Sequence, residues 1–372
     1  MATIPGDPGP LTWLHIGDLH LKEPGGKNHR DLERIVAAAV SLPPRSLDFV
    51  LLPGDNADDG TAAQYAMVRH ALAPLRLPVH VLPGDHDMAS GSLDAFHAVL
   101  GARTLPYAEV VRGQRCLFLD VVSAGTGGPG FRLGTTQLDW TERQVEEAAA
   151  AGQDVAVFMH TYPADLREGA ERLGSLLAHP HVSCVDMGHT HYNELANDGG
   201  TIFMATRSTG QTEEGPSGFS IVALDAGCIS WRFKALDAVW PFVLVTYPAD
   251  VRITTERSRG TARGLVRAQV FCDAPLNEVT LRAGDGPART MQPVAGQPGL
   301  FHGMLEAPAE RVVVRACDAV GRSDEDAVEP APADHAMPRT VADGSDKDAI
   351  KAWPEKGIVG GQLGPNRNGR KW

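Results

Sequence analysis

The 372-residue sequence predicts an α/β protein whose chain continues into a smaller all-β domain. Between residues 11 and 235, short apolar runs alternate with segments whose apolar residues recur at helical spacing, an order typical of α/β folds. After about residue 236, short strand-like runs are separated by Gly, Pro and Asp, which indicates a small antiparallel β-sandwich. From about residue 329 the chain is rich in Pro, Ala, Asp and Gly, and little regular structure is expected there.

The first region contains strands and helices in alternation. Its first strand, residues 11–16, ends in Gly17-Asp18, and a helix follows because apolar residues between 32 and 40 fall on one helical face. Further strands are expected at residues 49–52, 79–82, 116–122, 155–159, 182–187, 202–205 and 219–224, and further helices at 62–72 and 137–151. Polar residues gather just after these strands, where open α/β sheets bind ligands.

Composition excludes several classes of function. With 34 Lys and Arg against 46 Asp and Glu, the net charge is −12, so nucleic acid is not expected as a partner. An anionic substrate then needs a local positive charge, and a bound cation is the obvious source. No apolar run approaches 18 residues, so a membrane is not an expected partner either.

The N-terminus and the cysteines predict a cytoplasmic location. The first residues lack a basic stretch followed by an apolar one, which argues against a secretory signal. The five cysteines are widely spread and contain no CxxC pair, so they are expected to be free thiols in a reducing compartment.

Five short motifs at strand exits carry the chemistry. Each is common by itself, but a series of five in this arrangement indicates one shared site. They are Asp18-Leu19-His20, Gly54-Asp55-Asn56-Ala57-Asp58, Gly84-Asp85-His86-Asp87, Met159-His160-Thr161 and Gly188-His189-Thr190-His191.

Carboxylates and imidazoles in such a group predict a pair of metal ions. Two cations about 3.5–4 Å apart need a shared ligand, and the two oxygens of Asp55 suit that role. A mixed set of oxygen and nitrogen ligands favours Mn, Fe, Zn or Co over Ca or Mg. In an extended segment His189 and His191 point to opposite sides, so each cation takes one of them unless a turn alters the geometry.

Taken in order, these motifs resemble those of the calcineurin-like metallophosphoesterases. The segments GDNADDGTAAQYAMVRHAL, LPVHVLPGDHD and QLDWTERQV are most similar to the bacterial class III cyclic-nucleotide phosphodiesterase branch of that family. The resemblance covers about residues 11–235 and implies a four-layer α/β/β/α sandwich. The expected domains are therefore a metallophosphoesterase catalytic domain at 1–238, a β-sandwich accessory domain at 239–328 and an extended tail at 329–372.

The resemblance also implies a role for each motif residue. The first metal would be held by Asp18, His20, Asp55 and His191. The second would be held by Asp55, Asp85, His160 and His189. A hydroxide bridging the two metals, Mn or Fe foremost, would attack phosphorus while His86 assists the leaving group. Asp58 and Asp87 would orient His86 or a ligand imidazole, with a loop cap as the alternative for each.

The expected function is the hydrolysis of small phosphoesters, most of all phosphodiesters, with 3′,5′-cyclic nucleotides as the named substrate. The alternatives are a phosphatase, a promiscuous organophosphate diesterase or triesterase, and a metal-binding scaffold without turnover. The sandwich is expected either to pack on the catalytic domain or to form a dimer or higher homo-oligomer.

Two positions depart from the family pattern, and the tail adds an open question. Asp85 stands where the family usually has Asn, which would favour diesters or neutral triesters over monoesters; the alternative is neutral drift. Thr161 stands where many relatives have a second His, which leaves His160 as the ligand. The tail from Lys356 contains no acidic residue, so it is either flexible or docks at an active-site mouth, with Arg367 near phosphate.

Overall fold

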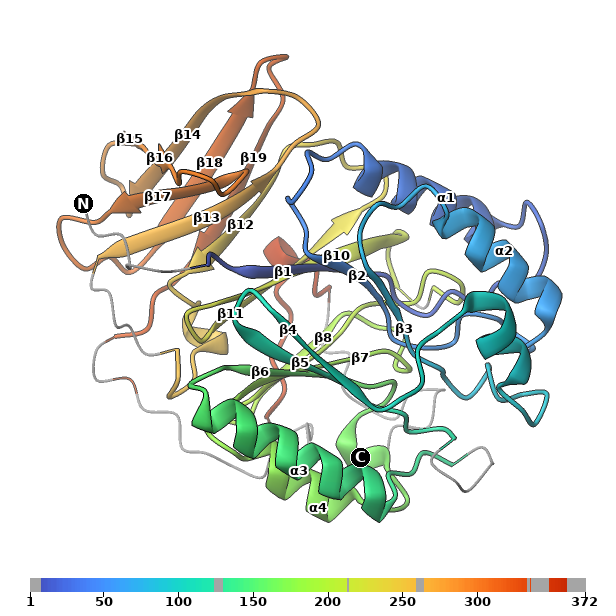
Figure 1. The fold of residues 1–372 in the computed structure, drawn as a ribbon. Coiled ribbons are helices and arrows are strands. Elements are labelled where there is room, and N and C mark those ends of the chain that lie inside the picture. Colours follow the sequence, from blue (N-terminus) through green and yellow to red (C-terminus); the bar gives the residue numbers. More distant parts are fainter. Residues whose placement is uncertain are drawn as a thin grey trace.

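The structure is a computed structural model that describes residues 8–123, 130–212, 214–258, 264–332, 335 and 348–359. Two β-sheets pack face to face, and a pair of helices covers the outer side of each sheet (Figure 1). The helices are α1 (Lys27–Val40) and α2 (Ala62–Leu72) on one side, and α3 (Thr135–Ala150) and α4 (Ala170–Leu177) on the other. The predicted four-layer α/β/β/α sandwich is confirmed.

The first sheet has five strands in the order β11-β10-β1-β2-β3, and the second has six in the order β4-β5-β6-β7-β9-β8. The first contains β1 (Leu11–His15), β2 (Phe49–Leu52), β3 (Val79–Val81), β10 (Gly218–Asp225) and β11 (Cys228–Ala235). The second contains β4 (Tyr107–Val111), β5 (Gln114–Phe118), β6 (Val155–Phe158), β7 (Val182–Met187), β8 (Glu194–Asn197) and β9 (Ile202–Ala205). We call these two sheets and their helices the body.

Parallel pairing determines where the polar motifs lie. Strands β1, β2 and β3 run parallel, as do β5, β6, β7 and β9. Strands of this kind are covered on both faces, which explains why they read as continuous apolar runs in the sequence. Their carboxyl ends meet at one edge of each sheet, so the loops that follow them converge.

Aromatic rings fill the space between the two sheets. Trp13 stacks on Phe49 with 5.8 Å between ring centroids, and Phe118 stacks on Phe158 at 4.8 Å. His15 lies at the same level, fully buried, with Nδ1 2.8 Å from Asp186 Oδ1. This core holds the ends of β1 and β6 at a fixed separation.

Most predicted elements occur within a few residues of their expected bounds. Helix α2 begins where expected because Thr61 and Gln64 form a capping box at its N-terminus. Helix α4 and the edge strands β4, β8 and β11 were not predicted. Helix α4, β4 and β8 are short and mix polar with apolar residues, so neither a helical nor a strand period stands out.

The predicted all-β region is confirmed as two four-stranded antiparallel sheets, ordered β12-β13-β17-β16 and β15-β14-β18-β19. We call this region the sandwich. Its strands are β12 (Phe242–Tyr247), β13 (Leu265–Phe271), β14 (Leu276–Ala283), β15 (Arg289–Thr290), β16 (Gln292–Pro293), β17 (Leu300–Met304), β18 (Val312–Asp318) and β19 (Ser323–Val328). We propose domain limits at 238/239 and 328/329, between β11 and β12 and just after β19.

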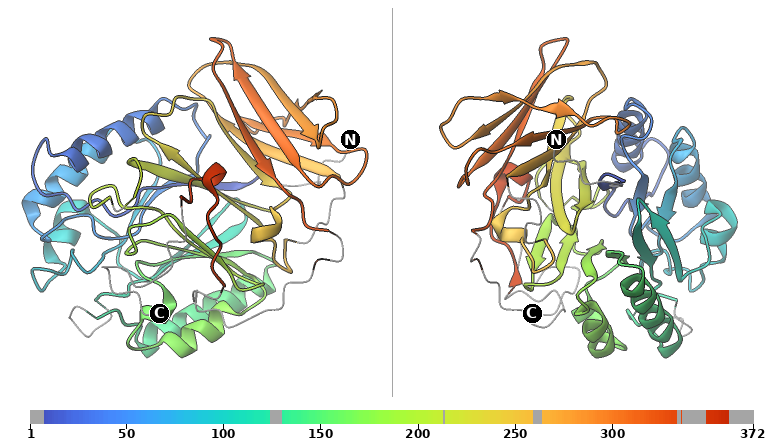
Figure 2. Two further views of the ribbon diagram at one scale, coloured as in Figure 1. Left: turned by 180° about the vertical axis from the view of Figure 1, so that it is seen from behind. Right: turned by 60° about the vertical axis from the view of Figure 1, so that its left-hand side comes forward.

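The described part of the chain also contains the short helical turns η1 (Phe96–Leu100), η2 (Pro163–Asp165), η3 (Val251–Ile253) and η5 (Pro354–Lys356). The last belongs to a segment at 348–359 that lies against both the body and the sandwich (Figure 2). No helix in the described part of the chain is long and apolar enough to span a membrane. All five cysteines are free thiols, four of them buried.

Candidate metal centre

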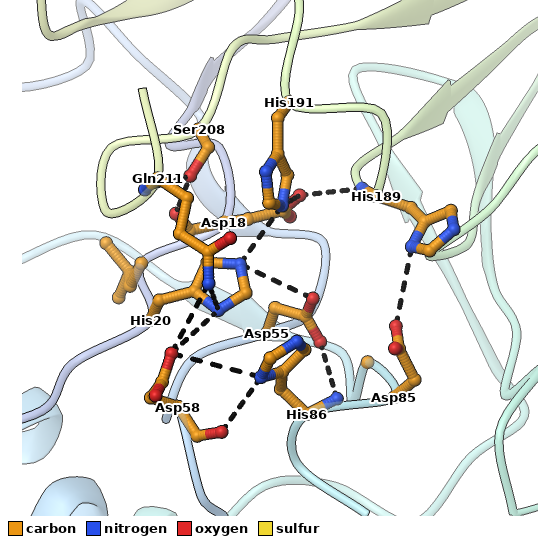
Figure 3. A network of polar contacts seen from close by, with 12 residues as sticks. Asp18, His20, Asp55, Asp58, Asp85, His86, His189, His191, Ser208 and Gln211 are labelled. Atoms are coloured by element: carbon orange, nitrogen blue, oxygen red, sulfur yellow. Dashed lines mark hydrogen bonds and ion pairs between the residues drawn. The ribbon is translucent and has the colours of Figure 1, made fainter. Parts of the chain in front are cut away.

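The seven predicted metal ligands come together at the carboxyl ends of the strands. Their ligand atoms form two groups, and within each group the atoms lie within 4.8 Å of one another. The groups are Asp18, His20, Asp55 and His191, and Asp55, Asp85, His160 and His189. Figure 3 shows most of these side chains turned toward one another from loops that follow different strands.

Four of these residues have an unusual backbone conformation. The φ angle is +43° at His20, +51° at Asp55, +67° at His189 and +66° at His191. A positive φ is unfavourable for residues other than glycine and persists only where the surroundings impose it. Since seven described non-glycine residues have a positive φ, more than half of this strain lies at the candidate centre.

In the first group, two imidazole nitrogens face each other. His20 Nε2 lies 3.0 Å from His191 Nε2 and 3.6 Å from Asp55 Oδ2. His191 Nε2 lies 3.5 Å from Asp18 Oδ2. Two Nε2 lone pairs and two carboxylate oxygens directed at one point are a donor set that fits a transition-metal cation.

The second group uses the other oxygen of Asp55. His160 Nε2 lies 3.5 Å from Asp55 Oδ1 and 3.2 Å from Asp85 Oδ1. His189 Nδ1 lies 3.4 Å from the same oxygen of Asp85. Asp55 therefore directs one oxygen to each group, which is the arrangement that a shared ligand requires.

Hydrogen bonds to the backbone orient these ligands. His160 Nδ1 lies 3.0 Å from the carbonyl oxygen of Pro53, so an Nδ1–H donated there leaves the Nε2 lone pair directed into the group. The backbone N–H of His189 donates to Asp18 Oδ2 at 2.7 Å. The backbone N–H of His86 donates to Asp55 Oδ1 at 2.9 Å.

The glycines of the motifs are required by close packing. A Cβ on Gly54 would lie 2.2 Å from His160 Nδ1, and one on Gly84 would lie 2.1 Å from Asp55 Oδ1. A Cβ on Gly188 would lie 2.3 Å from Asp18 Oδ1. Each Gly before a ligand therefore lets a neighbouring loop bring its own ligand close.

The pKa shifts indicate that the buried carboxylates of this cluster have no permanent positive charge beside them among the described residues. Burial, together with His191, lowers the pKa of His20 to about 2, and burial raises the pKa of Asp55. Burial would lower the pKa of His160, but Asp55 and Asp85 outweigh it and raise the value to about 10. Burial would raise the pKa of Asp85, but hydrogen bonds from His160 and His189 hold it below its usual range. Cations would replace the protons that this cluster otherwise holds.

His86 and Asp58 lie beside the two groups, and Asp58 contacts both His86 and the ligand imidazole of His20. His86 Nδ1 is 2.8 Å from the backbone carbonyl oxygen of Asp58 and 3.9 Å from the carboxylate oxygen Oδ1. That Oδ1 is closer to His20 Nδ1, at 3.4 Å. The His86 side chain is 37% exposed, so its other nitrogen can face an incoming molecule.

Asp87 holds two loops together. Its buried carboxylate accepts hydrogen bonds from the backbone N–H groups of Gly84, Asn56 and Ala57, and from the side chains of Asn56 and Tyr65. Among the described residues none of these donors is an imidazole. The contacts correspond to the loop-cap alternative for Asp87.

Two further residues near the centre were not predicted. Ser208 Oγ donates to the carbonyl oxygen of Asp18 at 2.7 Å. The Gln211 amide nitrogen lies 3.2 Å from His20 Nδ1 and 3.4 Å from Asp58 Oδ1 (Figure 3). Both lie in a loop after β9 that contains none of the motifs, so no spacing in the sequence signals them.

The sequence and the fold were compared with those of known proteins, and the matches support a metal-dependent site. Residues 11–193 match the family model described as calcineurin-like phosphoesterase. The chain carries a calcineurin-like metallophosphoesterase domain. This assigns it to the phosphoester hydrolases and agrees with the resemblance predicted from the motifs.

Two curated relatives show how far the similarity extends. The 3′,5′-cyclic adenosine monophosphate phosphodiesterase CpdA of Escherichia coli (strain K12) is 28% identical over 239 residues, covering 60% of this chain and 85% of that protein. The glycerophosphodiester phosphodiesterase GpdQ of Enterobacter lignolyticus is 28% identical over 198 residues, covering 48% of this chain and 69% of that protein.

Among solved structures, a dimetal phosphatase from Danio rerio superposes with a TM-score of 0.53 at 16% sequence identity. The match covers 61% of this chain and 96% of that structure. At this level of identity the similarity supports the metallophosphoesterase fold.

Proposed function

We propose that this protein hydrolyses small phosphodiesters with two transition-metal ions. Asp18, His20, Asp55 and His191 would hold the first ion. Asp55, Asp85, His160 and His189 would hold the second. The observation that carries this proposal is Asp55, whose two oxygens face two separate groups of ligands.

The donor set supports manganese or iron in both positions, with zinc or cobalt as alternatives. Each group combines carboxylate oxygens with imidazole nitrogens, a mixture that first-row transition metals accept. Bound there, two cations would supply Lewis acidity toward a phosphoryl oxygen and would lower the pKa of a coordinated water.

Within this site His86 is the candidate that exchanges a proton with the leaving oxygen. Its Nδ1–H is directed to the carbonyl oxygen of Asp58, which fixes the ring and leaves Nε2 for the substrate. The half-exposed ring lies at the open side of the cluster, with its centroid 4.5 Å from that of His20. The Asp58 carboxylate, 3.4 Å from His20 Nδ1, would orient that ligand.

Charge favours diesters over monoesters. Asp85 contributes a carboxylate to the second group, so the site carries one positive charge fewer than it would with Asn at this position. A smaller positive charge weakens the attraction for a doubly charged monoester more than the attraction for a singly charged diester.

Cyclic nucleotides are the proposed physiological substrates. The CpdA relative named above supports this choice, because that protein is named for such a substrate. Beside the second group, the half-buried ring of Phe131 lies 4.6 Å from the ring of His189 and offers an apolar surface for a sugar or base. A homo-oligomer formed through the sandwich, and a cytoplasmic location, remain predictions.

A substrate panel on the manganese-loaded enzyme tests the proposal. It contains cyclic AMP, a linear diester, a monoester, a triester and a phosphonate ester. We expect the two diesters to have the highest kcat/KM. A monoester that exceeds both would favour a phosphatase, and a metal-loaded protein without any turnover would favour a scaffold.

The Asp85→Asn variant tests the charge argument on its own. We expect the ratio of monoester to diester kcat/KM to rise by about tenfold, since one unit of positive charge is gained beside the phosphate. Metal content measured on the same samples controls for weaker binding of the second ion. An unchanged ratio at full metal content would remove charge as the source of selectivity.

A further inference from the structure

Residues 348–359, which we call the C-terminal strap, lie beside the edge strand β8. The backbone N–H of Ile350 donates to the carbonyl oxygen of Leu195 at 2.8 Å, and Ala349 forms an antiparallel bridge with Ala196. The strap, coloured red, runs from η5 beside the sandwich down across the strands of the body (Figure 2, left). It covers an edge of the six-stranded sheet.

Two kinds of contact fix the strap in place. Trp353 and Ile358 are buried, at 3% and 1% exposure, in the same apolar cluster as Trp231 of β11. The ammonium of Lys356 is buried and pairs with Asp326 of β19 in the sandwich. The strap is therefore anchored to the body and to the sandwich at once.

Between these anchors, the carbonyl oxygen of Gly357 accepts two hydrogen bonds from the body. The donors are Asn193 Nδ2 at 2.9 Å and Arg207 Nη2 at 2.8 Å. Gly357 has a φ of +98°, and a Cβ there would lie 2.6 Å from Phe233 Cβ. Glycine is thus required for the strap to present this carbonyl to the two buried side chains.

Asn193 and Arg207 belong to the two loops that carry candidate site residues. Asn193 follows His191 by two residues, and its Oδ1 accepts from the backbone N–H of Arg207 at 2.9 Å. Arg207 directly precedes Ser208, whose backbone N–H donates to the carbonyl oxygen of His191 at 3.3 Å. A single carbonyl of the strap therefore joins the loop of His191 to the loop of Ser208.

The second loop reaches the first metal group itself. Ser208 Oγ donates to the Asp18 carbonyl oxygen and accepts from the backbone N–H of Gln211 at 2.8 Å. The side chain of Gln211 then lies against His20 (Figure 3). Three of the four ligands of this group are thus connected to the strap through two or three hydrogen bonds.

We propose that the C-terminal strap positions the first metal group, with Arg207 and Gly357 as positioning residues. This inference rests on the proposed metal-dependent function. Its consequence is specific: loosening the strap weakens the first metal more than the second. Of the second group only His189 shares the loop of His191, whereas His160 and Asp85 lie on loops without a contact to the strap among the described residues.

The test is a manganese titration of the metal-free full-length protein by calorimetry, with kcat and KM measured at saturating metal. Gly357→Ala displaces the carbonyl and is expected to weaken one of the two manganese equivalents by about tenfold or more. The other equivalent loses less affinity, and kcat falls more than KM rises. Gly321→Ala is the matched control, because Gly321 has a φ of +88° in a sandwich turn with open space around it.

Arg207→Lys is a second test, because it removes the guanidinium that bonds to Gly357 but keeps the buried positive charge. We expect it to weaken the same manganese equivalent. The inference is overturned if both equivalents keep their wild-type affinity in Gly357→Ala and in Arg207→Lys while circular dichroism shows that both proteins are folded. A parallel loss of both equivalents also overturns it. A wild-type protein that binds fewer than two manganese ions would instead contradict the proposed function, so the two failures are distinguishable.

Discussion

The body and the sandwich differ in which residues adopt a positive φ. All seven described non-glycine residues with a positive φ lie in the body, between residues 20 and 226. In the described part of the sandwich the residues with a positive φ are Gly264, Gly284, Gly296, Gly299 and Gly321. The sandwich therefore turns its chain at no steric cost, whereas the body places strained residues at the metal centre.

The two regions also differ in the partners of their buried carboxylates. In the sandwich, Asp318 pairs with Arg322 at 2.6 Å, so a cation of the protein lies beside the carboxylate. In the body, Asp18, Asp55 and Asp85 converge on imidazoles that also serve as candidate ligands. A fold that arranges carboxylates without permanent cations is suited to hold metal ions, and its stability then depends on them.

The largest expected effect is at Asp55. Asp55→Asn keeps the volume but removes the charge of the shared ligand, so both metal ions should bind more weakly. We expect kcat/KM for a diester to fall on the order of 10⁴-fold. Metal analysis after gel filtration should find fewer than two ions in each chain.

Asp318→Asn is the matched control for Asp55→Asn, since Asp318 is an equally buried carboxylate in the sandwich. It should lower the midpoint of thermal unfolding while metal content and kcat/KM stay at wild-type levels. If Asp318→Asn also lost metal, the division between the two regions would be wrong.

The next effect is at His86, which separates proton transfer from metal binding. His86→Ala removes the half-exposed imidazole and leaves every proposed metal ligand in the sequence. We expect kcat to fall by about 10²- to 10³-fold with both metal ions retained. A leaving group of low pKa should restore part of the rate, because it needs less protonation. A uniform loss across leaving groups would argue for a binding role.

The strand ends could be predicted from the sequence because parallel strands place their exits at one edge. Asp18, Asp55 and His160 follow apolar runs directly, so a two-sheet arrangement brings them together. The glycine before Asp55 and the glycine before Asp85 gave a further indication, and close packing explains both. This part of the site follows from local sequence and topology.

The supporting residues could not be predicted, because their contacts depend on how distant loops meet. Gln211 reaches His20 across 191 positions, and Arg207 reaches Gly357 across 150. Nothing in the spacing or the type of these residues indicates in the sequence that the two members of each pair are in contact. The sequence left two roles open for Asp87, the acidic residue after His86, because a carboxylate there suits either an imidazole or a loop cap. Its position in the loop directs it to backbone N–H groups.

A smaller effect is expected in the core of the sandwich. Leu281 of β14 is 4% exposed among apolar neighbours, and Leu281→Ala should lower the free energy of unfolding by about 3 kcal/mol through lost packing. Because the sandwich holds no proposed ligand, kcat/KM at 25 °C should stay within about twofold. Chemical denaturation and steady-state kinetics on the same sample test both statements.

The smallest effect is a dependence of stability on pH at His80, a buried residue of the body outside the metal centre. Its ring stacks on Phe118 at 4.2 Å, and Nδ1 lies 2.9 Å from the Tyr107 hydroxyl. Burial lowers the pKa of His80 from 6.5 to about 4, although Glu109 opposes this shift. The folded state therefore binds fewer protons than the unfolded state between these values. Stability that is present above pH 6.5 is lost as the pH falls toward 4.

His80→Gln removes this titration and keeps a side chain that can hydrogen-bond to Tyr107. From pH 7 to pH 4.5 the wild type should lose about 1–2 kcal/mol more of its free energy of unfolding than the variant. Acid titration of the metal centre acts on both proteins and cancels in the difference. If the two curves of unfolding free energy against pH run parallel, His80 is protonated in the folded state. The acid sensitivity of the body would then come from other buried groups, those of the metal centre among them.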